Sequence, residues 1–261
     1  MKNSLKAIFL DIDETLVTNE TGPFPEDVEQ IEEAHRRGHK IFLSTGRGLA
    51  HIPGILKDAP WIDGIIAGAG AQVVIGDRTI YHKWIPQELL PAICALYFQL
   101  NKFCVFEGAN GVYGIKLPEH YNTDEKIFSV TKKDDFLTKY SDAIISKLTI
   151  EGEISEKERN FLSEYFQLNT FPPVYFEGII LGESKSKGMS IVLETLDIPR
   201  ENSIAIGDSR NDIDIICAAG LGIAMGNACA ELKAVAGEIT GDCGKGGVGQ
   251  AIKKFVLEQQ L

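Results

Sequence analysis

The sequence predicts an α/β protein with a doubly wound parallel sheet as its core and a smaller α+β domain inserted into that core. In residues 1–82 and again in 183–261, short apolar runs alternate with helix-type segments, as they do in the βα units of a parallel sheet. Between these stretches, residues 83–182 combine hairpin signals with helical segments. We therefore expect a core domain built from 1–82 and 183–261, and an inserted α+β domain at 83–182.

Composition and charge narrow the class of protein. The chain has 261 residues, and its 26 basic and 37 acidic side chains give a net charge of −11. This charge argues against a general nucleic-acid binder, and it means that an anionic substrate needs local cations or a metal. No apolar run approaches the ~20 residues of a membrane span, and the N-terminus lacks the features of a signal peptide, so we expect a cytoplasmic protein. The five cysteines are scattered without a CxxC pair, which indicates reduced thiols.

The first apolar run, residues 7–10, stops at two aspartates, Asp11 and Asp13. The run is too short for a typical helix and is typical of a buried strand. Ligands of open α/β sheets bind just outside the carboxyl ends of the strands, which is where these carboxylates lie. Two like charges about 4 Å apart repel by about 4 kcal/mol at an effective dielectric of about 20, which a divalent cation or a shared proton would relieve. The alternative is a pair of solvated or helix-capping acids, and these residues alone leave both open.

A helix and a second strand follow. Residues 26–37 are acidic at the start, basic at the end and closed by Gly38, which are matching helix start and stop signals. Residues 40–43 form a short apolar strand that ends in Ser44-Thr45-Gly46-Arg47. A hydroxyl, a glycine and a cation at a strand end can hold an anion through main-chain N–H groups and the next helix N-terminus. Taken alone, the same residues form a common turn.

The remaining elements are expected from apolar periodicity and turn signals. In the core we expect strands at 64–67, 71–75, 79–82, 203–206, 222–224 and 238–240, with helices at 184–196 and 247–258. In the inserted domain we expect helices at 86–99 and 155–165, with strands at 103–107, 112–116, 141–150 and 174–181.

Two further groups of polar residues stand out in the second half of the core. The strand at 203–206 ends in Gly207-Asp208-Ser209-Arg210-Asn211-Asp212. Asp208 and Asp212 are four positions apart and point to one side if a helix starts between them, although acids here can also simply complement a helix dipole. Lys187 lies on the helix at 184–196, where a solvated surface charge is the alternative to a functional cation.

These groups follow one another in the order of a known superfamily. The sequence resembles the haloacid dehalogenase-like (HAD) superfamily, and within it the Cof-type sugar-phosphate phosphatases. Their pattern is DxDGT, then an S/T-G-R turn, a cap insertion, a lysine and GDxxND. The resemblance spans nearly the whole chain, and an N-terminal DxDxT paired with GDxxND before an apolar helix is quite specific. It implies that 1–82 and 183–261 form the HAD-like catalytic core and that 83–182 form an α+β cap domain.

The resemblance implies a magnesium-dependent phosphatase that hydrolyses small phosphate monoesters, sugar or polyol phosphates, through an aspartyl phosphate. It makes Asp11 the nucleophile and Asp13 the acid that protonates the leaving oxygen and then the base that deprotonates water. Mg²⁺ would be held by Asp11, by the main-chain carbonyl of Asp13 and by Asp208, with Asp212 as a direct or water-mediated ligand.

The resemblance also implies the groups that bind the phosphate. Thr45 and the N–H of Gly46 would hold the phosphoryl oxygens, and Asn211 would add an amide donor. Lys187 would neutralise charge between nucleophile and phosphate. Arg47 is either a phosphate contact or a surface residue at a helix start.

The chain departs from the Cof-type pattern at two positions. Glu14 stands where the pattern usually has Gly, which predicts an extra anion near the mouth of the site and leaves the chemistry intact. Ala69 stands where relatives often have Asn, which puts a polar contact to the substrate in doubt.

Two other function classes remain as alternatives. One is a phospho-receiver protein, whose domains are near half this length and carry no cap. The other is a phosphate-ligand binding protein without turnover, against which the Asp11 and Asp13 pair argues. As partner we expect a small phosphorylated metabolite, with neither nucleic acid nor membrane, and a monomer or small homo-oligomer.

Overall fold

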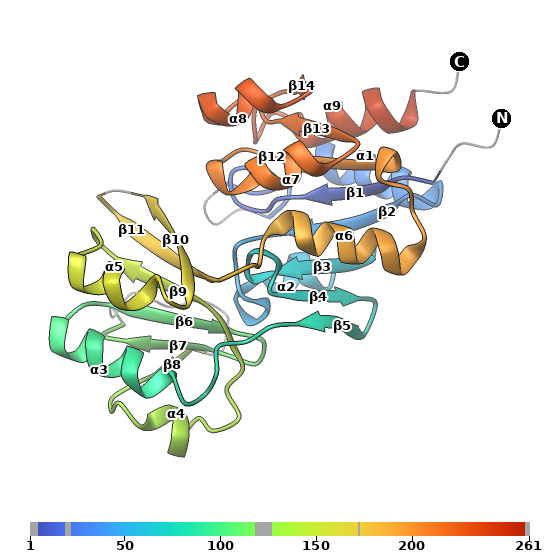
Figure 1. Cartoon of the computed structure of the whole chain (residues 1–261). Helices are drawn as coiled ribbons and strands as arrows, with labels where there is room; N and C mark the ends of the chain where they lie inside the picture. Colours follow the sequence, from blue (N-terminus) through green and yellow to red (C-terminus); the bar gives the residue numbers. More distant parts are fainter. Residues whose placement is uncertain (1–4, 19–21, 118–126, 172, 259–261) are drawn as a thin grey trace. The chain divides into compact units, whose positions relative to one another are not determined.

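The computed structural model describes residues 5–18, 22–117, 127–171 and 173–258 (Figure 1). The chain divides into two units: residues 1–46, 54–81 and 184–261 form the first, and residues 47–53 and 82–183 form the second. The sequence-based division assigned residues 47–53 to the core, whereas their contacts are with the second unit.

The first unit is built on an eight-stranded sheet with the strand order β14-β13-β12-β1-β2-β3-β4-β5. The pairs from β14 through to β3 are parallel, β4 turns back antiparallel to β3, and β5 forms the edge. β1 lies between β12 and β2 and is fully buried, which is why its sequence is a continuous apolar run. The strands are β1 (Ala7–Leu10), β2 (Lys40–Ser44), β3 (Gly64–Ala67), β4 (Gln72–Ile75), β5 (Arg78–His82), β12 (Ser203–Gly207), β13 (Leu221–Ala224) and β14 (Glu238–Ile239).

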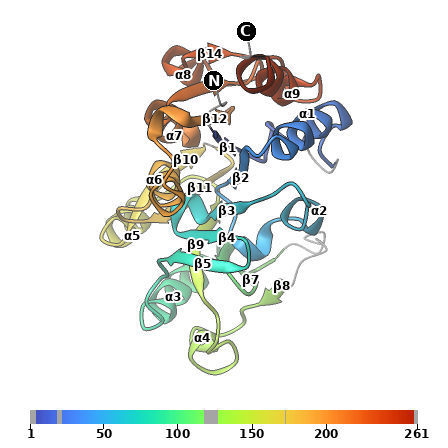
Figure 2. The same cartoon turned by 90° about the vertical axis from the view of Figure 1, so that its right-hand side faces the viewer.

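Helices cover both faces of this sheet, as expected for a doubly wound core. α6 and α7 lie on one side of the strands, and α1 and α9 lie on the other (Figure 2). α1 has Pro25 in its first turn, acids at its start and His35 and Arg36 at its end, all of which favour a helix there. The helices are α1 (Pro25–Arg36), α2 (Gly54–Lys57), α6 (Lys185–Leu196), α7 (Ile213–Ala218), α8 (Ala230–Val235) and α9 (Gly247–Ile252), the last followed by a π-helical turn, Lys253–Leu257.

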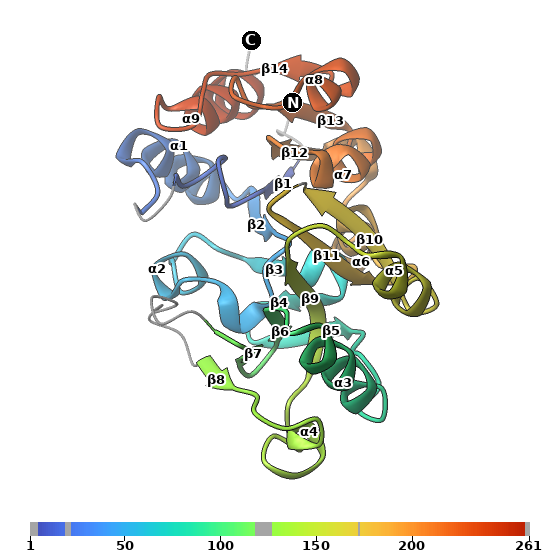
Figure 3. The ribbon, with the colours of Figure 1, turned by 90° about the vertical axis from the view of Figure 1, so that its left-hand side faces the viewer.

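The second unit has a six-stranded sheet with the order β10-β11-β9-β6-β7-β8. Its neighbouring strands are antiparallel except for β7 and β8. Figure 3 shows α3 and α5 beside these strands. The elements are α3 (Leu90–Leu100), β6 (Cys104–Gly108), β7 (Val112–Ile115), β8 (Ile127–Ser129), α4 (Asp135–Thr138), β9 (Ile145–Glu151), α5 (Glu156–Leu162), β10 (Phe166–Phe171) and β11 (Tyr175–Ile180).

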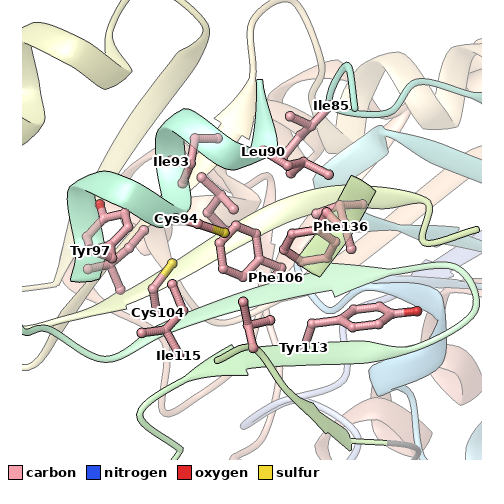
Figure 4. Packing of buried hydrophobic residues seen from close by; sticks show 14 of the residues in the cluster. Ile85, Leu90, Ile93, Cys94, Tyr97, Cys104, Phe106, Tyr113, Ile115 and Phe136 are labelled. Carbon is pink, nitrogen blue, oxygen red and sulfur yellow. The ribbon is translucent and has the colours of Figure 1, made fainter. Parts of the chain in front are cut away.

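A separate hydrophobic core holds the second unit together. Ile93 and Tyr97 of α3 pack with Phe106 of β6 and with Phe136, whose ring centroid is 4.9 Å from that of Phe106 (Figure 4). Strand residues alternate between the two faces of a sheet, so the neighbours of Phe106, Val105 and Glu107, point away from this core. The second unit thus has one apolar face under its helices and one face free to carry polar groups.

Two strands of the second unit differ from the prediction. β8 and β10 were not expected, and the helix predicted at 155–165 ends at Leu162. β10 begins at Phe166, directly after the predicted helix, in a stretch for which the sequence predicted no element. Within the described residues, no helix has the length and apolar character needed to cross a membrane. All five cysteines are free thiols.

Candidate active site

Three neighbouring strands bring the predicted polar residues to one edge of the sheet. Asp11 follows β1, Thr45 follows β2 and Asp208 follows β12. These strands are parallel, so their carboxyl ends lie side by side. The N–H of Asp11 donates to the carbonyl of Ile206 (3.0 Å), which continues the pairing of β1 with β12 by one residue.

Three carboxylates converge at this edge. One oxygen from each of Asp11, Asp208 and Asp212 lies within 4.8 Å of the others. Asp212 reaches the group because its chain turns back over β12: its Oδ2 accepts hydrogen bonds from the N–H groups of Asp208 and Ser209, both 3.1 Å. Gly207 makes this turn possible, since a Cβ there would lie 2.5 Å from Cγ of Asp212.

A buried lysine sits between two of these carboxylates, and it is Lys185. Its Nζ is 2.7 Å from Oδ1 of Asp11 and 2.5 Å from Oδ1 of Asp212, and the residue is 1% exposed. Nζ also lies 3.5 Å from Oδ1 of Asn211. Lys185 therefore cross-links the ends of β1 and β12 electrostatically from the first turn of α6.

Lys187, the lysine expected at this place from the sequence, lies elsewhere. Its Nζ donates to the hydroxyl of Tyr81 (2.9 Å) and lies 4.8 Å from the centre of that ring. A sequence signal for the right lysine existed. The buried face of α6 comprises Gly188, Met189 and Val192, and helical spacing extends this face back to position 185 and not to 187.

The electrostatics of the cluster follow from burial and mutual repulsion. Burial and the charge of Asp212 raise the pKa of Asp11 well above its usual range, despite the neighbouring Lys185. Burial and Asp212 likewise raise the pKa of Asp208 to about 7. Burial alone would lower the pKa of Lys185, but Asp11 and Asp212 outweigh it and raise that pKa above its ordinary value, so Lys185 is a fixed cation.

The donor set of the cluster fits a hard divalent cation. Three carboxylates face one ammonium group, so with all of them ionised two negative charges remain uncompensated. That excess equals the charge of one Mg²⁺, an ion that prefers carboxylate and carbonyl oxygens. Both oxygens of Asp212 already accept hydrogen bonds, which favours an indirect role for this residue. The side chain of Asp13 is not part of the three-carboxylate group.

The segment after Asp11 forms a tight turn. The N–H groups of Thr15, Leu16 and Val17 all donate to the carbonyl of Ile12, at 3.3, 2.9 and 3.0 Å. The hydroxyl of Thr15 donates to Oδ1 of Asp208 (3.3 Å), which joins this turn to β12. Asp13 is exposed at the outer side of the turn, in keeping with a group that exchanges protons with substrate and water.

Both departures from the Cof-type pattern fall on strained backbone. Glu14 has φ 56° and Ala69 has φ 54°, the left-handed region that Gly and Asn tolerate best. The carbonyl of Glu14 accepts a hydrogen bond from Nδ2 of Asn227 (2.8 Å). The Gly and Asn that are usual at these two positions thus suit the left-handed backbone found there, which the sequence alone did not reveal.

The predicted phosphate-binding residues divide between the two units. Thr45 is buried at the end of β2, where its carbonyl accepts from the N–H of Ala69 (3.0 Å), and Gly46 follows it in the first unit. Asn211 accepts from the hydroxyl of Ser209 (2.8 Å) through Oδ1, which leaves its NH₂ to donate elsewhere. Arg47 belongs to the second unit, and its Nη1 donates to the carbonyl of His51 (3.2 Å).

Comparison with known proteins gives one family. The family model described as haloacid dehalogenase-like hydrolase matches residues 8–252. The 5-amino-6-(5-phospho-D-ribitylamino)uracil phosphatase YcsE of Bacillus subtilis is 28% identical, over 97% of this chain and 96% of its own. A phosphoglycolate phosphatase of Methanopyrus kandleri is 23% identical, over 96% of this chain and 97% of its own. The solved structure of the HAD subclass IIB sugar phosphatase BT4131 is 30% identical with a TM-score of 0.80, covering 96% of this chain and 98% of that one.

Proposed function

The chain is a phosphatase that belongs to the haloacid dehalogenase-like hydrolases, and on that basis we propose that it hydrolyses small phosphate monoesters through a phosphorylated Asp11 with the help of Mg²⁺. One observation carries the proposal. Lys185 fixes Oδ1 of Asp11 at 2.7 Å within a cluster of three carboxylates, at the carboxyl ends of two adjacent parallel strands.

In the first half of the reaction, a carboxylate oxygen of Asp11 attacks phosphorus and the bond from phosphorus to the ester oxygen breaks. Asp13 gives its proton to that oxygen, and the alcohol leaves. In the second half, Asp13 takes a proton from water, whose oxygen attacks the phosphoryl group and frees Asp11. Lys185 favours the ionised form of Asp11 before the attack and orients its carboxylate, in the place for which Lys187 was expected.

The residues proposed for Mg²⁺ are Asp11, Asp208 and the main-chain carbonyl of Asp13, with Asp212 reaching the ion through water. When bound, the ion supplies positive charge toward the phosphoryl oxygens. Thr45, the N–H of Gly46 and the amide of Asn211 are the proposed donors to those oxygens.

Sugar or polyol phosphates are the proposed substrates. Two relatives support this class: the ribityl phosphate in the name of the phosphatase YcsE, and the sugar phosphatase BT4131. We also propose that the second unit acts as a cap that selects the leaving group, so that substitutions there change the ranking of substrates. We expect the enzyme to act on a soluble metabolite in the cytoplasm, as a monomer or small homo-oligomer.

The test is turnover of p-nitrophenyl phosphate and of a panel of sugar phosphates by the wild type and by Asp11→Asn, each with Mg²⁺ and with EDTA. We expect Mg²⁺-dependent turnover that EDTA abolishes reversibly, and a loss of several orders of magnitude in Asp11→Asn. Undiminished turnover in EDTA would remove the metal from the proposal. Tight binding of a phosphate ester without turnover would support the phosphate-ligand binding alternative.

A further inference from the structure

The segment that follows the proposed phosphate-binding residues belongs to the other unit. Thr45 and Gly46 lie in the first unit, whereas residues 47–53, with a single helical turn at Leu49–His51, lie in the second. This turn contacts β6. The chain therefore passes from the first unit to the second between Gly46 and Arg47, directly after the expected phosphate-binding residues.

One buried carboxylate holds this turn. Oε2 of Glu107, on β6, accepts a hydrogen bond from the N–H of Gly48 (2.9 Å) and lies 2.9 Å from Nδ1 of His51. Its other oxygen accepts from the hydroxyl of Thr149 (2.7 Å) and lies 3.4 Å from Nζ of Lys147. Glu107 is 2% exposed, so its charge is removed from water and each oxygen is held by two partners.

The turn lies directly against the strand. A Cβ at Gly48 would be 2.8 Å from Cβ of Glu107 and 3.1 Å from the carbonyl carbon of that residue, so only glycine fits there. The carbonyl of His51, at the end of the same turn, accepts the hydrogen bond from Nη1 of Arg47 (3.2 Å). Glu107 thus holds both ends of the turn 48–51, and the carbonyl at the end of this turn holds the guanidinium of Arg47.

We propose that Glu107 is a positioning residue, which acts on substrate binding by fixing the turn 48–51 and through it the guanidinium of Arg47. The proposal rests on the proposed function, in which the substrate carries a phosphate. For Arg47 it adopts the phosphate contact of the two interpretations, and the variant Arg47→Ala tests this choice. Glu107 itself touches the turn and not the phosphate.

The chain offers a matched control for Glu107. Lys147 is 4% exposed and lies between Glu107 and Glu177, with Nζ 2.5 Å from Oε1 of Glu177. Glu177 is 6% exposed, and among the described residues it contacts Lys147 without any hydrogen bond to the turn. Removing Glu177 therefore disturbs the same buried cation and leaves the turn in place.

The experiment combines kinetics with hydrogen exchange. For Glu107→Ala we expect KM for p-nitrophenyl phosphate to rise about tenfold while kcat changes by less than about threefold, since ground-state binding is what weakens. Amide exchange in the peptide that contains Gly48 should accelerate at least about tenfold. Glu177→Ala should show neither change. Arg47→Ala should raise KM by itself, and Glu107→Ala should add nothing further in its presence.

Each result decides the proposal. Unchanged exchange at Gly48 in Glu107→Ala, equal effects in Glu177→Ala, or additive effects of Glu107→Ala and Arg47→Ala on KM would overturn it. If Glu107→Ala does not fold, Glu107→Asp serves, because it keeps the negative charge facing Lys147 while its shorter side chain withdraws the carboxylate from the N–H of Gly48. The exchange measurement needs no turnover, so failure of the proposed phosphatase reaction is distinguishable from failure of this inference.

Discussion

At Lys185, a single ammonium group contacts two carboxylates from different strands. A buried charge of this kind is costly unless it is paired, and here it is paired twice, with Asp212 held in turn by the N–H groups of Asp208 and Ser209. The arrangement explains why the cation must come from the buried face of α6. Lys187, two residues along the same helix, is half-buried and contacts Tyr81.

These two lysines give the first prediction. Lys185→Met should lower kcat/KM by about 10²-fold or more, because the charge beside Asp11 is lost where it acts at short range. Lys187→Met should stay within about threefold of the wild type. Steady-state kinetics on p-nitrophenyl phosphate checks this, and a comparable loss in both variants would mean that position 187 contributes to catalysis after all.

The two aspartates after β1 give the second prediction. Asp13→Asn keeps the proposed nucleophile Asp11 but lacks the proposed proton donor, and general acid catalysis is worth about 10²–10⁴-fold. A sugar phosphate has a poor alkoxide leaving group that needs this proton, whereas p-nitrophenolate hardly does. Formation of the aspartyl phosphate should therefore be impaired much more for the sugar phosphate. Single-turnover bursts measure this step, and an equal loss of burst for both esters would remove Asp13 from the acid role.

At the level of turns and helices, local backbone geometry explains what the sequence could and could not show. The sequence showed the sheet through the apolar runs of β1, β2, β3 and β12, because strands buried on both faces of a parallel sheet are continuously apolar. The ends of these runs also located Asp11, Thr45 and Asp208. The rotation of α6 decided which lysine points inward, and this depends on a helix start at Lys185 that Ser184 caps. Contacts between distant segments, such as Glu107 with Gly48, leave no local pattern.

Glu14, whose backbone lies in the left-handed region, gives a prediction about stability. Glu14→Gly should raise the free energy of unfolding by about 0.5–1 kcal/mol, since relief of the strained φ outweighs the greater freedom of glycine in the unfolded chain. Glu29→Gly, in the middle of α1, should instead lower it by about 1 kcal/mol. Urea unfolding of both variants is the measurement. A destabilised Glu14→Gly would show that the Glu14 side chain makes a compensating interaction.

At the level of the whole molecule, the cluster of acids couples folding to pH. The pKa of Asp208 is near its ordinary value of 3.8 when the chain is unfolded and is raised to about 7 when folded, by burial and Asp212. Between these values the unfolded chain binds fewer protons, so the contribution of Asp208 to the free energy of unfolding falls as pH rises from about 4 to 7. Asp11 acts in the same direction, whereas His39 and His82, whose pKa values are lowered by burial, act in the opposite one.

The last prediction isolates this effect by comparing variants across pH. In EDTA, Asp208→Asn should gain stability relative to the wild type on going from pH 5 to pH 8, by about 2 kcal/mol, because only the two pH units between 5 and the folded pKa of about 7 contribute. Glu29→Gln, at an exposed glutamate, should follow the wild type at every pH. Lys147 and His51 hold the pKa of Glu107 well below its usual range despite its burial. Glu107 therefore changes the free energy of unfolding only at pH values below those of the experiment.

Magnesium supplies the second arm of the same measurement. If Mg²⁺ binds the ionised carboxylates of the folded chain as proposed, it should raise the midpoint of thermal unfolding much more at pH 8 than at pH 5, where protons compete with it. In Asp208→Asn the rise at pH 8 should largely disappear. Equal stabilisation of the wild type by Mg²⁺ at both pH values would show that the ion is not bound by the carboxylates with raised pKa values at the ends of β1 and β12. Lys185, without a metal ion, would then be what compensates the charge of the acidic cluster.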